Sequence, residues 1–157
     1  MTMFTFEILC IGNELLSGTT VNTNAQWLSQ KITESGGCVM RITIVRDDID
    51  EIALVIKESL ARKPRWLIIS GGLGPTYDDK TLQGVGMSLG VQLALEKRAV
   101  EMLRKSYSRH LVNYDELNEI RLKMATIPIG SIPTCWHRTL CYNRNCRNKD
   151  YLPSRST

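Results

Sequence analysis

The feature that most constrains the fold is a glycine-rich segment that directly follows a short apolar run. Residues 66–69 read Trp-Leu-Ile-Ile, typical of a buried strand, and residues 70–79 read Ser-Gly-Gly-Leu-Gly-Pro-Thr-Tyr-Asp-Asp. From Thr81 onward the apolar residues have helical spacing. Glycines let a backbone approach a ligand closely, and free amides near a helix N-terminus favour phosphate. The segment therefore predicts a phosphate-binding loop in an α/β sheet.

Two acidic residues at the end of this loop point to a metal ion. Asp78 and Asp79 would repel phosphate, so their position predicts a divalent cation that bridges carboxylate and phosphate. Either residue could instead cap the helix that begins near Thr81. The two roles are compatible.

Strand and helix patterns alternate along the chain. Ile49, Ala53, Ile56 and Leu60, for example, recur at helical spacing. This alternation predicts a three-layer α/β fold, with a mostly parallel sheet and helices on both faces. Strands are predicted at residues 4–11, 38–45 and 66–69, and helices at residues 22–35, 49–60, 81–89, 97–111 and 115–124.

Polar loops follow each predicted strand, at residues 12–24, 46–50 and 71–79. In a parallel sheet the carboxyl ends of the strands meet at one edge, and ligands bind beyond that edge. We therefore expect the polar side chains of the three loops to lie together.

Composition narrows the class of partner. A chain of 157 residues with 43% hydrophobic residues is long enough for one compact domain. The net charge of +4 arises after residue 133, because residues 1–133 carry equal numbers of basic and acidic residues. We therefore expect no nucleic-acid partner. No apolar run reaches the roughly 18 residues of a membrane span, and no signal-like segment begins the chain, so we expect a cytoplasmic protein without a membrane partner.

Four motifs occur in order: Gly-Asn-Glu-Leu-Leu-Ser-Gly at residues 12–18, Asn-Thr-Asn at 22–24, Val-Arg-Asp-Asp at 45–48, and the glycine-rich segment with its Asp pair at 71–81. Together they resemble the N-terminal domain of the competence-damage-inducible CinA family, a relative of the molybdopterin-binding domain. With Arg-Leu-Lys-Met-Ala at residues 121–125, the resemblance covers residues 8–133.

The resemblance implies a domain that binds a nucleotide-like or pterin-phosphate ligand. Domains of the CinA type are associated with metal-dependent hydrolysis of ADP-ribose. It implies that Glu14, Asp48 and Asp79 are the catalytic carboxylates, of which Asp48 and Asp79 hold a magnesium or cobalt ion. The ligand-binding residues that it implies are Gly12, Asn22, Asn24, Gly71, Gly72, Gly74, Pro75, Thr76, Asp78 and Thr81.

Three positions leave part of this assignment open. Asn22 and Asn24 offer amides for ribose or base recognition, but they would equally well cap the start of a helix. Asn13 stands where many relatives carry Asp. One carboxylate of the family pattern is therefore absent.

Three functions fit these residues. The first is a metal-dependent nucleotide pyrophosphatase acting on ADP-ribose-like substrates. The second is molybdopterin binding with adenylyl transfer, although Leu73 and Pro75 favour the CinA branch. The third is nucleotide binding without catalysis. The resemblance also implies a homodimer or homotrimer. Larger family members add a C-terminal amidase domain that acts on nicotinamide mononucleotide. No part of this sequence resembles that domain, so we do not expect deamidation.

Residues 134–157 depart from the family pattern. They lose periodicity and carry five basic residues against one acidic. Relatives have Asn-Pro-x-Gly-Thr-Ala-Pro-Gly here, and residues 134–139, translated one nucleotide later, permit Pro-Val-Gly-Thr-Ala-Pro. We therefore predict a folded domain at residues 1–133 and a frameshifted tail at 134–157, with a genuine divergent tail, disordered or weakly helical, as the alternative. A shifted tail would lack the loop that closes the pocket and would cost the sheet a strand.

Overall fold

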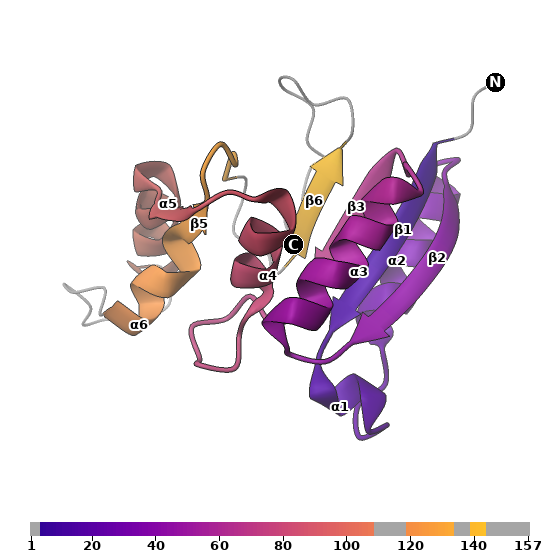
Figure 1. Cartoon of the computed structure of the whole chain (residues 1–157), viewed down its shortest axis with the longest axis horizontal. Helices are drawn as coiled ribbons and strands as arrows, with labels where there is room; N and C mark the ends of the chain where they lie inside the picture. Colours follow the sequence, from indigo (N-terminus) through magenta and orange to yellow (C-terminus); the bar gives the residue numbers. More distant parts are fainter. Residues whose placement is uncertain (1–3, 109–118, 134–138, 144–157) are drawn as a thin grey trace.

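The computed structural model describes residues 4–108, 119–133 and 139–143. Strands and helices alternate through the first half of the chain, close to the predicted bounds (Figure 1). The elements are β1 (Thr5–Ile11), α1 (Asn13–Leu16), α2 (Thr23–Glu34), β2 (Cys38–Val45), α3 (Ile49–Ala61), β3 (Trp66–Ser70), α4 (Thr81–Leu89), β4 (Leu93–Leu95), α5 (Lys97–Ser108), α6 (Glu119–Leu122), the 3₁₀ turn η1 (Lys123–Ala125), β5 (Thr126–Pro128) and β6 (Thr139–Asn143).

The main sheet has the strand order β2-β1-β3-β6. Strand β1 pairs in parallel with β2 and β3, and β6 pairs antiparallel with β3. The predicted mostly parallel α/β fold is therefore confirmed.

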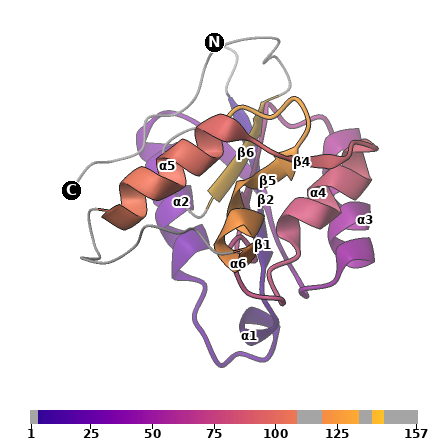
Figure 2. The ribbon, with the colours of Figure 1, turned by 90° about the vertical axis from the view of Figure 1, so that its left-hand side faces the viewer.

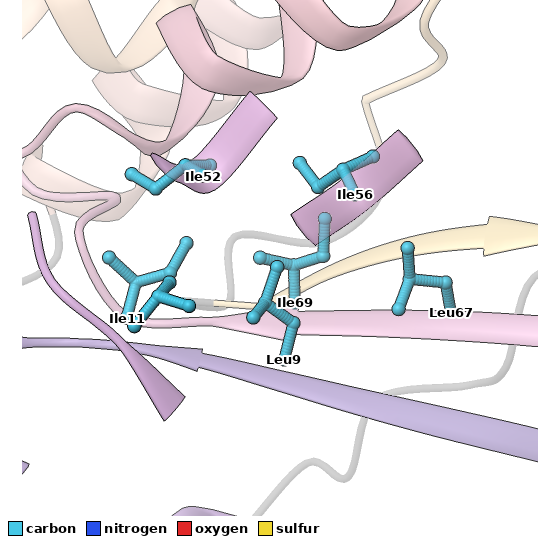
Figure 3. Close-up of a cluster of buried hydrophobic side chains, with 7 residues drawn as sticks. Leu9, Ile11, Ile52, Ile56, Leu67 and Ile69 are labelled. Atoms are coloured by element: carbon cyan, nitrogen blue, oxygen red, sulfur yellow. The ribbon is translucent and has the colours of Figure 1, made fainter. Parts of the chain in front are cut away.

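Helices cover both faces of the sheet. Successive side chains of β1 point to opposite faces, so each face presents apolar side chains that a helix buries. Leu9 and Ile11 point to the α3 face, where they pack with Ile52 and Ile56 (Figure 3). Ile8 and Cys10 point to the other face, beneath α2. Helix α4 packs beside α3.

A smaller lobe follows α4 in the chain (Figure 2). Strands β4 and β5 form an antiparallel pair, and Leu103 of α5 packs with Met124 and Ala125 of η1. The sequence analysis did not predict β4 and β5, because strands of three residues are too short to show a periodicity. Of the helix predicted at residues 115–124, the described part is α6 followed by η1, and residues 115–118 lie outside the described residues.

Strand β6 lies within the tail. A shifted tail is expected to cost the sheet a strand, and a divergent tail to be disordered or weakly helical, whereas the backbone of Thr139–Asn143 pairs with Trp66–Ser70 in an unbroken register. The backbone amides and carbonyls along the free edge of β3 provide the hydrogen-bonding groups for this pairing. Residues 134–138, where relatives have the loop that closes the pocket, lie outside the described residues.

In the part of the chain that the structure describes, no helix is both long enough and apolar enough to cross a membrane.

Candidate functional site

Three loops leave β1, β2 and β3 at the same edge of the sheet. The parallel register sets Ile11 beside Val45 and Cys10 beside Ser70, so the strands end together. The amide of Gly12 then donates to the carbonyl of Val45 at 3.1 Å. This edge gathers most of the residues that the sequence analysis selected.

The glycine-rich loop packs directly on the end of β1. Gly71 has a φ of +99°, and a Cβ at this position would lie 2.0 Å from the carbonyl oxygen of Ile11. A side chain is therefore excluded both by conformation and by space. This close approach fixes the start of the loop against the strand.

Thr81 joins the two ends of the glycine-rich loop through hydrogen bonds on its buried side. Its side chain is fully buried, and its hydroxyl donates to the carbonyl of Gly71 at 2.8 Å. Its amide donates to the carbonyl of Gly72 at 3.2 Å. The sequence analysis gave Thr81 a role in ligand binding, whereas the structure gives its hydroxyl to the backbone of the loop.

The far end of the loop folds around Asp79. Its carboxylate accepts hydrogen bonds from the amide and the hydroxyl of Thr76, at 2.8 and 2.5 Å. Burial alone would raise the pKa of Asp79, but the hydrogen bonds from Thr76 and Gly74 and the charge of Lys123 outweigh it and lower the pKa. Asp79 is therefore held as a carboxylate.

Asp47 lies between the loop after β1 and the glycine-rich loop. One of its oxygens accepts the amide of Asn13 at 3.0 Å, and the other faces Gly72. Partial burial raises the pKa of Asp47, and the negative charges of Glu14, Asp79 and Asp78 raise it further, against the amide of Asn13. The carboxylates of the loops after β1, β2 and β3 thus lie close enough for their charges to act on Asp47.

Asp48 has a different position from the one expected. It is the N-cap of α3, and its carboxylate accepts the amide of Glu51 at 3.0 Å. The sequence analysis named Asp48, rather than Asp47, as a catalytic and metal-binding residue. A sequence signal was available, because the residue immediately before a helix favours capping and Ile49 begins the predicted helix.

Two other predicted residues hold the framework of the site. Asn22 is the N-cap of α2, where its side chain accepts the amide of Ala25 at 3.0 Å. Asn24 donates from its side chain to the hydroxyl of Ser70 at 3.1 Å, just before the glycine-rich loop. Asn22 therefore caps a helix, and Asn24 connects α2 to β3, while a role of either residue in ribose or base recognition stays a prediction.

The remaining predicted residues lie on the surface of the loops. Asp78 and Thr76 are exposed, and Pro75 is half-buried in the same loop. The carboxylate of Glu14 folds back over Gly12, since a Cβ on Gly12 would lie 2.5 Å from Glu14 Oε1. The site assignment as a whole stays a prediction.

A pocket of about 370 Å³ opens between the glycine-rich loop and the smaller lobe. Its walls are mainly leucine side chains, with Asp79, Glu119 and Lys123 as its charged residues. The residues that line it are Gly72, Leu73, Gly74, Asp79, Leu82, Gln83, Leu93, Leu95, Glu119, Leu122, Lys123 and Thr126. The sequence analysis did not identify this pocket, because its walls come from elements that are far apart in the chain.

Within the described ranges, no three His, Cys, Asp or Glu side chains are grouped closely enough to hold a metal ion by themselves. A cation at this edge would therefore need oxygens from a ligand or from water in addition to Asp47 and Asp79. Magnesium commonly binds in this way, through one or two carboxylates and the phosphates of its substrate.

The fold and this edge define an α/β domain that presents a glycine-rich loop and several carboxylates beside a pocket for a small molecule. Residues 7–148 match the family described as "Probable molybdopterin binding domain", and the chain belongs to that family. The matched range extends beyond residue 133 and includes β6.

Two solved structures share the fold of this chain. It is 37% identical to the protein CinA of unknown function from Thermoplasma acidophilum, with a TM-score of 0.71 over 81% of this chain and 72% of that one. The resemblance to CinA is therefore confirmed. The tungsten cofactor synthesizing protein MoaB from Pyrococcus furiosus shares the fold, with 17% identity and a TM-score of 0.53 over 70% of this chain and 66% of that one.

Curated relatives are longer than this chain. A protein of Sulfolobus acidocaldarius is 50% identical over 127 residues, which are 81% of this chain and 47% of the relative. A protein of Sulfurisphaera tokodaii is 47% identical over 133 residues, which are 85% of this chain and 49% of the relative. The chain thus spans about half the length of the curated relatives that it matches.

Proposed function

We propose that this domain is a divalent-metal-dependent hydrolase that cleaves the diphosphate of ADP-ribose-like nucleotides. The observation that carries the proposal is the position of Asp47, whose carboxylate lies between the loop after β1 and the glycine-rich loop, within reach of the negative charges of Glu14, Asp78 and Asp79. A carboxylate whose pKa is raised by burial and by neighbouring negative charges, as that of Asp47 is, is typical of catalytic sites that bind a cation or move a proton.

The glycine-rich loop would bind the phosphates. Gly71 and Gly72 both have positive φ, a conformation that favours glycine, and because glycine has no side chain the backbone of the loop after β3 is open to a ligand at these two residues. Backbone amides in such a loop are good partners for phosphate oxygens. The apolar pocket beside the loop would hold the ring of the nucleotide.

Asp47 and Asp79 are the residues that would hold the cation. The fit rests on charge. Burial and the negative charges of Glu14, Asp79 and Asp78 raise the pKa of Asp47, and a bound cation would offset those negative charges. When bound, a magnesium or cobalt ion would offset the charge of the diphosphate and acidify a water molecule. Glu14, which is exposed beside Gly12, would accept the proton of the attacking water.

The test is ADP-ribose hydrolysis by the purified chain, with magnesium or cobalt added and AMP and ribose 5-phosphate measured as products. Metal-dependent release of both products is the expected result. Binding of ADP-ribose without any release would end the proposal.

A second candidate is molybdopterin binding without hydrolysis. It is favoured by the leucine-lined pocket beside the glycine-rich loop, which suits a fused ring that carries a phosphate. Calorimetric titration with molybdopterin, compared with ADP-ribose, separates this candidate from the first. Nucleotide binding without turnover, the third function considered from the sequence, would appear in the same titrations.

A further inference from the structure

Lys123 is the cation of the pocket. It begins η1, and its ammonium donates a hydrogen bond to the carbonyl of Thr76 in the glycine-rich loop. Among the described residues that line the pocket, it alone carries a positive charge, whereas Asp79 and Glu119 are negative.

The position of Lys123 is fixed by the packing of its neighbours. Met124 and Ala125 are buried against α5, and the carbonyl of Ala125 accepts the amide of Glu96 at 2.9 Å. The backbone of η1 is therefore anchored, while the long side chain of Lys123 reaches across the pocket to the loop. A flexible stem on a fixed backbone allows the ammonium to exchange one nearby oxygen for another.

Negative charge surrounds the glycine-rich loop. The charges of Glu14, Asp79 and Asp78 act on Asp47 at the sheet edge, where a phosphate would need a cation beside it. On the pocket side, Asp79 and Glu119 are also negative, and Lys123, whose charge acts on Asp79, is the described lining residue that would attract a phosphate. A neutral carbonyl, such as that of Thr76, is a weaker partner for an ammonium than a phosphate oxygen is.

We propose that Lys123 binds the ligand phosphate nearest the leucine-lined pocket, exchanging the carbonyl of Thr76 for a phosphate oxygen. Lys123 then favours ligands in which a phosphate is attached next to the ring system that enters the leucine-lined pocket. This inference rests on the proposed function only in that the ligand is a phosphate ester, and it holds equally for a substrate that is hydrolysed and for one that is only bound.

The test compares AMP with adenosine, which lacks the phosphate, by calorimetric titration in the presence of magnesium. The variants are Lys123→Gln and the control Lys97→Gln, which removes an exposed positive charge from α5 in the same lobe. Lys123→Gln is expected to weaken AMP binding about tenfold, the value of one charge-assisted hydrogen bond, and to leave adenosine binding unchanged. Lys97→Gln is expected to change neither.

A merely structural role would give a different result. If Lys123→Gln weakens AMP and adenosine equally, or changes neither, the proposal is overturned. Should Lys123→Gln fail to fold, the unaltered chain with ¹³C-methylated lysines provides the readout, because methylation keeps the charge. The Lys123 methyl resonance is expected to shift with AMP and not with adenosine, and equal shifts would overturn the proposal.

The outcomes separate this inference from the proposed hydrolysis. AMP binding that depends on Lys123, in a chain that does not cleave ADP-ribose, supports the inference and ends the proposed hydrolase. A chain that binds neither AMP nor adenosine overturns the inference by itself.

Discussion

Asp47 accepts the backbone amide of Asn13 at 3.0 Å and so joins the loop after β2 to the loop after β1. Its neighbour Asp48 turns the other way and caps α3. Two identical side chains in sequence thus have separate roles, one at the ligand edge and one at a helix end. This difference gives a matched pair of variants.

Asp47→Asn is expected to lower kcat/KM for ADP-ribose at least about a hundredfold, the scale of losing a charged catalytic group. The variant should be as stable as the unaltered chain or more so, because a raised pKa means that the charged form of Asp47 is disfavoured in the fold. Steady-state kinetics and thermal unfolding measure the two effects.

Asp48→Ala is the control for Asp47→Asn. It is expected to cost about 1 kcal/mol of unfolding free energy through the lost cap, with activity close to that of the unaltered chain. If Asp48→Ala abolished activity and Asp47→Asn did not, the assignment made from the sequence alone would be correct.

Gly71→Ala is expected to lower the unfolding free energy by more than about 2 kcal/mol and to abolish ligand binding. The new Cβ would lie 2.0 Å from the carbonyl oxygen of Ile11, so the loop must leave the end of β1. Gly130→Ala is the control, since Gly130 also has a positive φ but has no atom within 4 Å of an added Cβ, and it should cost about 1 kcal/mol. Equal effects in denaturant titrations would contradict the argument from space.

Glu7 makes the stability of the fold sensitive to acid. It is buried in β1 and accepts two hydrogen bonds of 2.8 Å from Arg62. Burial raises the pKa of Glu7, but the bonds from Arg62 and Ser59 and the charge of Arg62 outweigh it, so the pKa lies below 4.5. The pair therefore stabilises the fold above that pH, and the stabilisation is lost as the pH falls through the lowered pKa.

Glu7→Gln tests this dependence. It is expected to cost about 2 kcal/mol at neutral pH and to flatten the loss of stability in acid, measured by urea unfolding across the pH range. Glu34→Gln, which breaks an exposed pair with Lys31, should change little. An unchanged acid profile in Glu7→Gln would contradict the prediction.

The frameshift reading of residues 134–157 stays a prediction, and it has a direct measurement. A protein with the restored frame is expected to close the ligand pocket and to hydrolyse ADP-ribose faster than this chain. Resequencing of the gene is expected to show the shift. An unshifted reading, with an intact mass that matches this chain, would contradict it.

The sequence by itself determined the strands and helices of the first half of the chain and the edge where their loops meet. Apolar periodicity is a local property, and the glycines that follow β3 require a tight turn wherever the chain is placed. The motifs at residues 12–18 and 71–81 likewise identified the family.

Only the tertiary structure decided which side chains meet at that edge. Asp47 rather than Asp48 faces the glycine-rich loop, and Thr81 turns inward to the carbonyl of Gly71. Lys123 reaches Thr76 from 47 positions away. Such pairings depend on how the smaller lobe packs against α4 and on which backbone groups need a partner. These are relations between distant segments, and no local pattern encodes them.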